Sequence, residues 1–125
     1  AIETCAKYSQ DRVQFGRPIN AFQAIQHKLA DIKMIKEAAK MVVYRVAHDK
    51  DSGKPLNHLH TSVAKSIVGD YGIKAASDAV QIFGGYGFIH EYPIERFLRD
   101  VKLAQIGGGT SEMQKFIISR ILSFM

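Results

Sequence analysis

The sequence is poor in residues that would tie it to an oxidising compartment or to a membrane. It contains a single cysteine, Cys5, and no tryptophan. One cysteine excludes an internal disulfide and fits a reducing compartment. The apolar runs are too short to cross a bilayer, and no charged-then-apolar leader with a small-residue cleavage site is visible. We therefore expect no membrane association.

Charge and histidine spacing argue against two further classes of function. The chain has 17 basic and 12 acidic residues, a net charge of +5. The basic residues mostly alternate with acids and form neither a cluster nor a recognition-helix pattern. None of the five histidines belongs to an H-x-x-x-H pair or to a carboxylate–histidine pair with the spacing of a di-metal bundle site. We expect neither a nucleic-acid partner nor a metal site.

Length and composition suit one domain, residues 1–125. A hydrophobic content of 46% over 125 residues is ordinary for a soluble globular protein with a real core. The chain opens at Ala1, and Ile2, Cys5 and Ser9 already follow a helical pattern with no capping residue ahead of them. We therefore expect a domain cut from a longer protein within its first helix.

Apolar residues recur at spacings of three and four along most of the chain, and no alternating strand pattern appears. Five helical segments are predicted: residues 1–13, 20–50, 57–83, 93 to 99 or 102, and from Thr110 or Ser111 to the end. The turn between the two long helices is short, which indicates antiparallel neighbours. The fold class is therefore predicted as all-α, an up-and-down four-helix bundle with two long central helices.

Glycine and proline mark the expected helix ends. Gly16 is predicted to cap the first helix, with Pro18 blocking its continuation, and Gly84 to end the second long helix. Gly69 and Gly72 lie inside that helix, where each costs about 1 kcal/mol relative to alanine. Their expected role is to let another backbone come near.

The sequence around Gly107–Gly109 predicts a ligand-contacting corner. Three adjacent glycines permit positive φ and leave no Cβ to keep a ligand away. Ser111 and Gln114 read as a capping box, so the next helix would begin at Thr110 or Ser111 and offer unpaired N–H groups that favour anions. The alternative is a flexible connector followed by an ordinary helix cap.

A second corner with little side-chain bulk lies in residues 81–87, QIFGGYG. Two such corners in one small domain suggest a bound ligand. Arginine suits planar or bidentate contacts with anions, and four arginines lie near the two corners in sequence: Arg12, Arg17, Arg96 and Arg99. The alternatives are local pairing of Arg96 and Arg99 with neighbouring acids and a plain surface position for Arg12.

Six segments together carry a family resemblance. They are YSQDRVQFG (residues 8–16), FQAIQ (22–26), DAVQIFGGYGF (78–88), YP (92–93), RD (99–100) and GGTSE (108–112). In this order, and over nearly the whole chain, they resemble the carboxy-terminal helical domain of the acyl-CoA dehydrogenases.

The resemblance implies an FAD enzyme that removes the α-proton of an acyl-CoA thioester while the β-hydrogen leaves as hydride to flavin N5. Electrons would pass to electron-transferring flavoprotein, and the enzyme would be a homo-oligomer, a dimer or tetramer. The implied cofactor-binding residues fall into two sets. On the FAD of a dimer mate they are Arg12, Gln23 and Gln81 to Gly85, which includes Ile82, Phe83 and Gly84; on the subunit's own FAD they are Thr110, Ser111 and Glu112.

The sequence departs from the family at the catalytic base. Many members carry a glutamate directly before the Gly-Thr pair, where this chain has Gly108, so Gly108 and Gly109 are implied only as substrate-binding. Relatives resembling isovaleryl-CoA and long-chain acyl-CoA dehydrogenases take the glutamate from an earlier helix position, which would lie upstream of Ala1. Either the base lies there or the parent has lost dehydrogenase chemistry. Glu112 is the local substitute, but its ordinary role is a favourable interaction with the helix dipole.

The resemblance leaves other functions open. One is a non-catalytic helical oligomerisation module that keeps the fold without its ligand. Another is a domain of a related acyl-CoA oxidase or flavin monooxygenase. For the acyl-CoA dehydrogenase interpretation we expect no catalytic residue in this chain and no activity of the isolated domain. The expected location is the cytoplasm of a bacterium or archaeon, or the mitochondrial matrix of a eukaryote.

Overall fold

The computed structural model describes residues 1–124, and almost all of them are helical. The elements, in order, are α1 (Ile2–Asp11), β1 (Val13–Gln14), β2 (Arg17–Pro18), the 3₁₀ helix η1 (Ile19–Ala21), α2 (Gln23–Asp51), α3 (His58–Phe83), the 3₁₀ helix η2 (Gly84–Gly87), α4 (Ile94–Ile106) and α5 (Ser111–Leu122). The predicted all-α class is confirmed.

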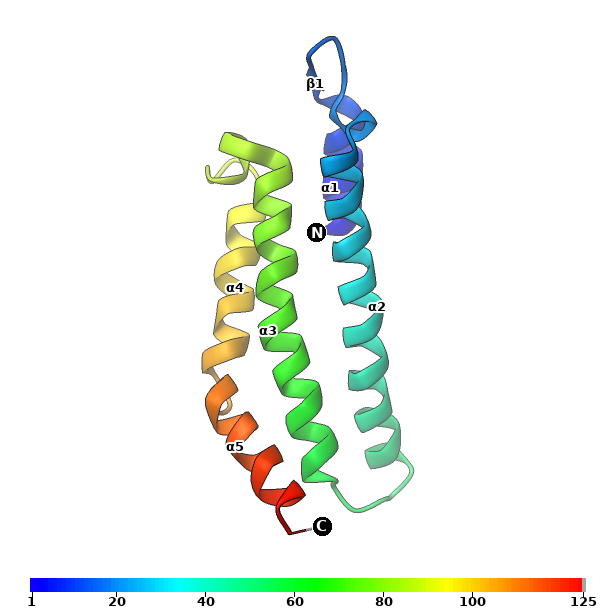
Figure 1. Cartoon of the computed structure of the whole chain (residues 1–125), viewed down its shortest axis with the longest axis vertical. Coiled ribbons are helices and arrows are strands. Elements are labelled where there is room, and N and C mark those ends of the chain that lie inside the picture. Colours follow the sequence, from blue (N-terminus) through cyan, green and yellow to red (C-terminus); the bar gives the residue numbers. More distant parts are fainter. Residues whose placement is uncertain (125) are drawn as a thin grey trace.

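The helices form an elongated up-and-down bundle. Helices α2 and α3 run antiparallel, α1 lies beside the upper part of α2, and α4 and α5 follow one another along the other side of α3 (Figure 1). The pair α4 and α5 thus takes the place of one long helix. Helix α3 contacts each of the other four α-helices, which makes it the centre of the bundle.

The apolar stripe of α2 folds inward as its spacing predicts. Ile32 is buried, and Ile25, Leu29 and Ile35 are half-buried. Further along the helix, Val42 is half-buried and Val43 is exposed. The stripe packs on α3, because a long helix with one apolar face is stable only against a partner.

The densest part of the core lies where α1, α2, α3 and α4 meet. Its buried members are Cys5, Ile19, Ile32, Ala79, Ile82, Phe83 and Ile94. Burial raises the pKa of the Cys5 thiol to about 11, so this cysteine behaves as a small apolar side chain rather than as a nucleophile.

The two glycines inside α3 have the close-packing role expected of them. A Cβ at Gly69 would lie 3.1 Å from the carbonyl oxygen of Ala104, and one at Gly72 would lie 2.8 Å from Cγ1 of Val101. Both neighbours belong to α4. The glycines therefore bring α4 close to α3 and fix where the following loop starts.

The end of the first helix differs from the prediction. Helix α1 stops at Asp11, and the chain then forms a small antiparallel hairpin in which Val13 pairs with Pro18. Gly16 lies in the hairpin turn with φ +77° beside Phe15 with φ +53°, so it does not cap α1. The hairpin also delays the start of α2 to Gln23, after η1.

The start of the last helix also differs in detail. Thr110 is the N-cap, and its hydroxyl accepts a hydrogen bond from the Met113 amide. The capping box expected of Ser111 and Gln114 is wrong, because the Ser111 hydroxyl points to another helix. In α5 the buried side chains are Ser111 and Gln114, while Met113 and Phe116 are exposed.

Acid should weaken this fold as its paired carboxylates are protonated. Hydrogen bonds from Lys54 and Arg45 lower the pKa of Asp49 from 3.8 to about 2. A carboxyl whose pKa is lower in the folded state adds stability above its unfolded pKa and loses it as the pH falls through the folded value. We expect the urea concentration at the unfolding midpoint of the domain to decrease as the pH is lowered from about 4 to 2. Asp49→Asn should make this decrease smaller. An identical pH profile for both proteins would contradict this.

Candidate functional site

The first glycine corner opens onto a large pocket at the end of the bundle where α1, α2 and α3 meet. The pocket has a volume of about 670 Å³. Its lining includes most of the residues implied for the FAD of a dimer mate: Arg12, Gln81, Ile82, Phe83, Gly84 and Gly85. These residues come from the end of α1 and the end of α3, so the fold brings together two of the sequence segments that carried the resemblance.

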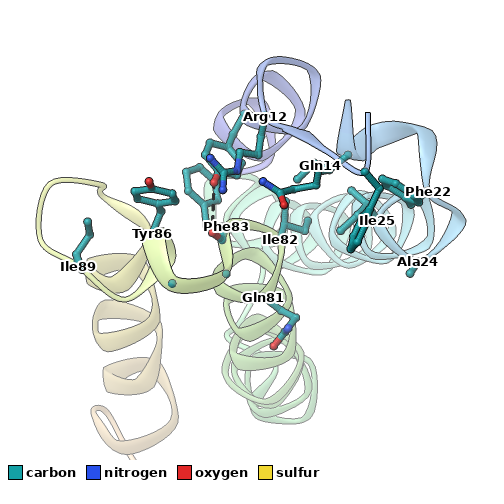
Figure 2. Close-up of a pocket in the computed structure, with 15 residues that line it drawn as sticks. Arg12, Gln14, Phe22, Ala24, Ile25, Gln81, Ile82, Phe83, Tyr86 and Ile89 are labelled. Atoms are coloured by element: carbon teal, nitrogen blue, oxygen red, sulfur yellow. Dashed lines mark hydrogen bonds between the residues drawn. The ribbon is translucent and has the colours of Figure 1, made fainter. Parts of the chain in front are cut away.

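Arg12 is the cation of this pocket. Its guanidinium lies 5.2 Å from the centre of the Tyr86 ring, within the range of a cation–π contact. In the part of the chain that the structure describes, Arg12 forms no ion pair. The neighbouring Asp11 forms a salt bridge with Lys7 at 3.0 Å instead. Figure 2 shows Arg12 and Tyr86 on the same side of the pocket, above Phe83. Arg12 is therefore available to an anion that enters the pocket.

Aromatic packing fixes the floor below Arg12. The rings of Tyr8 and Phe83 stack with centres 3.9 Å apart, and Tyr92 meets both at an edge. The Tyr8 hydroxyl donates to the Phe83 carbonyl oxygen at 3.4 Å, and burial raises the pKa of Tyr8. A neutral, well-packed Tyr8 supports the backbone from which Arg12 projects.

The remaining residues of this set lie at the pocket in different ways. Gly84 ends α3 with φ +59°, and a Cβ on Gly84 or Gly85 would meet no atom within 4 Å. The bare backbone therefore faces open space. Gln81 lines the pocket but extends away from Arg12 (Figure 2), and Gln23 lies beside the pocket without lining it.

The second corner forms a tight turn between α4 and α5. Gly108 and Gly109 have φ values of +65° and +93°, a conformation that favours glycine. A Cβ on Gly109 would lie 2.7 Å from Nε2 of Gln114, while one on Gly108 would meet nothing within 4 Å. The buried Gln114 amide lies 3.4 Å from the carbonyl oxygens of both glycines. A side chain at Gly109 would thus meet the Gln114 amide on a backbone that favours glycine, whereas Gly108 faces free space.

The start of α5 borders a second, polar pocket of about 320 Å³. Thr110, Ser111 and Glu112 line it together with Asp70 and Lys115. A hydrogen bond from its own amide, and a second from Thr110, hold the pKa of Glu112 below its usual range. Glu112 is therefore a charged first-turn residue, as a favourable interaction with the helix dipole requires.

The two corners do not meet within one chain. Their pockets have no lining residue in common, and they lie at different levels of the bundle, one at the upper end of α3 and the other beside its lower half (Figure 1). The two corners are therefore separate candidate sites on this chain.

The arginines of α4 have local partners. Arg99 pairs with Glu95 at 3.0 Å and Arg96 with Asp100 at 3.6 Å. Arg17 lies over the Phe22 ring at 4.3 Å and does not line the large pocket. Of the four arginines singled out in the sequence, only Arg12 lines that pocket.

Comparison with known proteins assigns the fold to a family. Residues 1–123 match the family described as "Acyl-CoA dehydrogenase, C-terminal domain". The chain belongs to the acyl-CoA dehydrogenase family. An acyl-CoA dehydrogenase of Bacillus subtilis (strain 168) is 48% identical over 122 residues, which cover 98% of this chain and 32% of that protein.

Solved structures agree with the family assignment. Butyryl-CoA dehydrogenase from Megasphaera elsdenii has a TM-score of 0.92 and 44% identity, over 97% of this chain and 31% of that one. The FAD complex of PigA has a TM-score of 0.90 and 30% identity, over 98% and 32%. A chain in the structure of the electron transferring flavoprotein of Acidaminococcus fermentans has a TM-score of 0.91 and 42% identity, over 97% and 32%. The chain spans about a third of the length of the curated relatives it matches.

Two residues of the acyl-CoA dehydrogenase domain escaped the sequence analysis. Tyr86 was named in the sequence only as part of residues 78–88, yet its ring lies against the Arg12 guanidinium. Asp70 was given no role from the sequence, yet it accepts hydrogen bonds from Gln105 of α4 and Ser111 of α5. Neither contact has a signal in local sequence, because each depends on packing between distant helices.

Among residues 1–124, no helix is long and apolar enough to span a membrane.

Proposed function

We propose that this chain is the C-terminal helical domain of an FAD-dependent acyl-CoA dehydrogenase and a piece of a longer protein. The parent would catalyse α,β-dehydrogenation of an acyl-CoA thioester. The observation that carries the proposal is the match of residues 1–123 to the family, with relatives named acyl-CoA dehydrogenases that are 40–48% identical. The isolated domain is proposed to be inactive, since it spans about a third of those relatives.

The residues present fit FAD in two half-sites. Arg12 supplies a cation without an ion-pair partner among the described residues, next to bare backbone at Gly84 and Gly85. Such a group suits a pyrophosphate, because arginine forms strong charge-assisted bonds with phosphate oxygens. Thr110 to Glu112 lie at the start of α5, where the helix dipole also favours phosphate. FAD would supply the acceptor for a hydride from the substrate β-carbon.

The separation of the two half-sites supports an oligomer. The two corners border separate pockets, so we infer that Arg12, Gln23 and residues 81–85 serve a neighbouring subunit's flavin. The corner at Gly108 to Glu112 would serve the subunit's own flavin. The exposed apolar side chains of α4 and α5, among them Leu103, Met113 and Phe116, provide surface for such contacts. A dimer or tetramer is proposed.

No residue of this chain is proposed as the catalytic base. Gly108 has no carboxylate, and its φ of +65° suits glycine. Glu112 is held as a carboxylate by its own helix start, so its geometry serves the helix rather than a substrate carbon. We propose that the parent supplies the glutamate from outside residues 1–125, as isovaleryl- and long-chain-like relatives do.

The electron acceptor is proposed to be electron-transferring flavoprotein. The likeness to a chain in the Acidaminococcus fermentans flavoprotein structure supports this choice. A cytoplasmic location is proposed for a bacterial or archaeal parent and the mitochondrial matrix for a eukaryotic one.

The experiment that tests the function is flavin uptake and turnover by the full-length parent. The purified protein should show a flavin spectrum after FAD reconstitution and should oxidise a panel of acyl-CoA thioesters with an artificial electron acceptor. A protein that takes up no FAD would be an oligomerisation module. Rapid reoxidation of the reduced flavin by oxygen would favour an oxidase or monooxygenase instead.

Gly108→Glu should disturb the substrate more than the flavin. The left-handed backbone costs a non-glycine residue roughly 1–2 kcal/mol, and the new carboxylate would enter the free space beside Gly108. We expect kcat/KM of the parent to change by at least about tenfold, the effect of some 1.4 kcal/mol on the transition state, with the FAD dissociation constant within about twofold.

Gly53→Glu is the matched control for this substitution. Gly53 also has a left-handed φ, +72°, and open space at its Cβ, but it lies in the turn between α2 and α3. It should leave both constants unchanged. Unchanged kinetics for Gly108→Glu as well would contradict the placement of this loop at the acyl site.

A further inference from the structure

Asp70 is joined to both ends of the glycine turn. Its Oδ1 accepts hydrogen bonds from the Gln105 amide at 3.0 Å and from the Ser111 hydroxyl at 2.5 Å, and its Oδ2 lies 3.3 Å from Nζ of Lys115. Gln105 lies two residues before the turn, and Ser111 directly follows the turn as the first residue of α5. We propose that Asp70 is a positioning residue that holds the Gly107–Thr110 turn in the shape that receives the acyl and flavin groups.

The turn needs an outside support because its own sequence gives it little. Three adjacent glycines have the largest conformational freedom of any tripeptide, and ordering them is costly. The Gly107 amide donates to the Leu103 carbonyl oxygen at 2.7 Å, but Gly108 has no neighbouring atom within 4 Å at its Cβ position, and the Gln114 amide lies 3.4 Å from the Gly108 and Gly109 carbonyl oxygens. The hydrogen bonds that Asp70 accepts from Gln105 and Ser111 are shorter than those of the Gln114 amide and are charge-assisted. They are therefore a stronger constraint than the Gln114 contacts.

Asp70 itself is held firmly enough to act as a support. It sits in the middle of α3, directly after Gly69, where α4 comes so close that a Cβ would lie 3.1 Å from the Ala104 carbonyl oxygen. The bonds from Ser111 and Gln105, followed by Lys115, lower the pKa of Asp70. It therefore stays ionised at neutral pH and keeps accepting from both sides of the turn.

Matched variants separate the effect of losing the hydrogen bonds that Asp70 accepts from the effect of losing its charge. Asp70→Ala removes all three contacts. Asp70→Asn keeps one oxygen that can accept from Gln105 and Ser111 but loses the ion pair with Lys115. Asp49→Ala is the control, because Asp49 also has two charged partners, Arg45 and Lys54 at 3.0 and 2.8 Å, yet it lies near the end of α2 and outside the pockets at the two glycine corners.

Hydrogen exchange in the full-length protein is the first readout. The peptide from Leu103 to Gln114 contains the bonded amides of Gly107 and Met113. We expect exchange of this peptide to accelerate at least about tenfold in Asp70→Ala, in line with the loss of charged hydrogen bonds. Asp70→Asn should stay within about threefold of the wild type, and Asp49→Ala should leave this peptide unchanged.

Ligand binding is the second readout, and this part rests on the proposed function. Asp70→Ala should raise the acyl-CoA KM or the FAD dissociation constant by at least about fivefold, and Asp70→Asn should restore it. Equal exchange in Asp70→Ala and Asp49→Ala, or no rescue by Asp70→Asn, would overturn the proposal. So would faster exchange with unchanged ligand constants. A wild-type protein without flavin would refute the proposed function alone, since the exchange data would still show whether Asp70 holds the turn.

Discussion

Arg12→Ala in the full-length parent is expected to weaken FAD binding by about 10- to 150-fold. Hydrogen bonds to a charged group contribute about 1.5–3 kcal/mol, and Arg12 is the one arginine that lines the large pocket in residues 1–124. Its contact with the Tyr86 ring does not neutralise its charge. A phosphate that approaches Gly84 and Gly85 would therefore find a cation already in place.

The FAD dissociation constant should be measured by fluorescence titration of the deflavinated protein, alongside Arg96→Ala. Arg96 carries the same charge and pairs with Asp100 on the outside of α4, so its loss should leave flavin affinity within about twofold, as is usual for exposed ion pairs. Equal FAD affinities for Arg12→Ala and the wild type would remove Arg12 from the flavin site.

Ile94→Ala is expected to lower the free energy of unfolding of the domain by about 2–5 kcal/mol. Ile94 is the first residue of α4 and has no exposed surface. It packs in the cluster with Phe83 and Ile82, so shortening its side chain removes buried surface and leaves a cavity. Since a domain of this size has a total stability of only about 5–15 kcal/mol, a loss of this kind is a large fraction of it.

Urea unfolding of the 125-residue chain, followed by circular dichroism, measures this effect. Leu103→Ala on the same helix is the control, because Leu103 is 65% exposed and should cost less than about 1 kcal/mol. Ile94→Val should cost about 0.5–1.5 kcal/mol. Similar losses for Ile94→Ala and Leu103→Ala would mean that α4 is not anchored through Ile94.

The long helices could be predicted from the sequence because their signals are local. The periodic stripe of α2 and the Asn57 cap of α3 each depend on residues within a few positions of one another. Arg12 and residues 81–85 were brought to one pocket, as the resemblance implied. Their roles toward FAD remain predictions.

The parts that sequence missed depend on tertiary contacts or on short elements. The β1–β2 hairpin has only two residues in each strand, too few to show alternation. The Ser111 hydroxyl could equally cap its own helix, and only the packing of α5 on α3 directs it to Asp70. The same packing makes Gln114 a buried residue of α5 rather than its expected capping partner.

Helix α3 sets the distance and the relative orientation of the two half-sites. Asp70, which holds one glycine corner, and Gly84, which forms the other, belong to one continuous helical path and are separated by roughly 20 Å at 1.5 Å per residue. One inserted or deleted residue between them would turn one half-site by about 100° relative to the other, since a turn takes 3.6 residues. This segment of the chain must therefore keep its length.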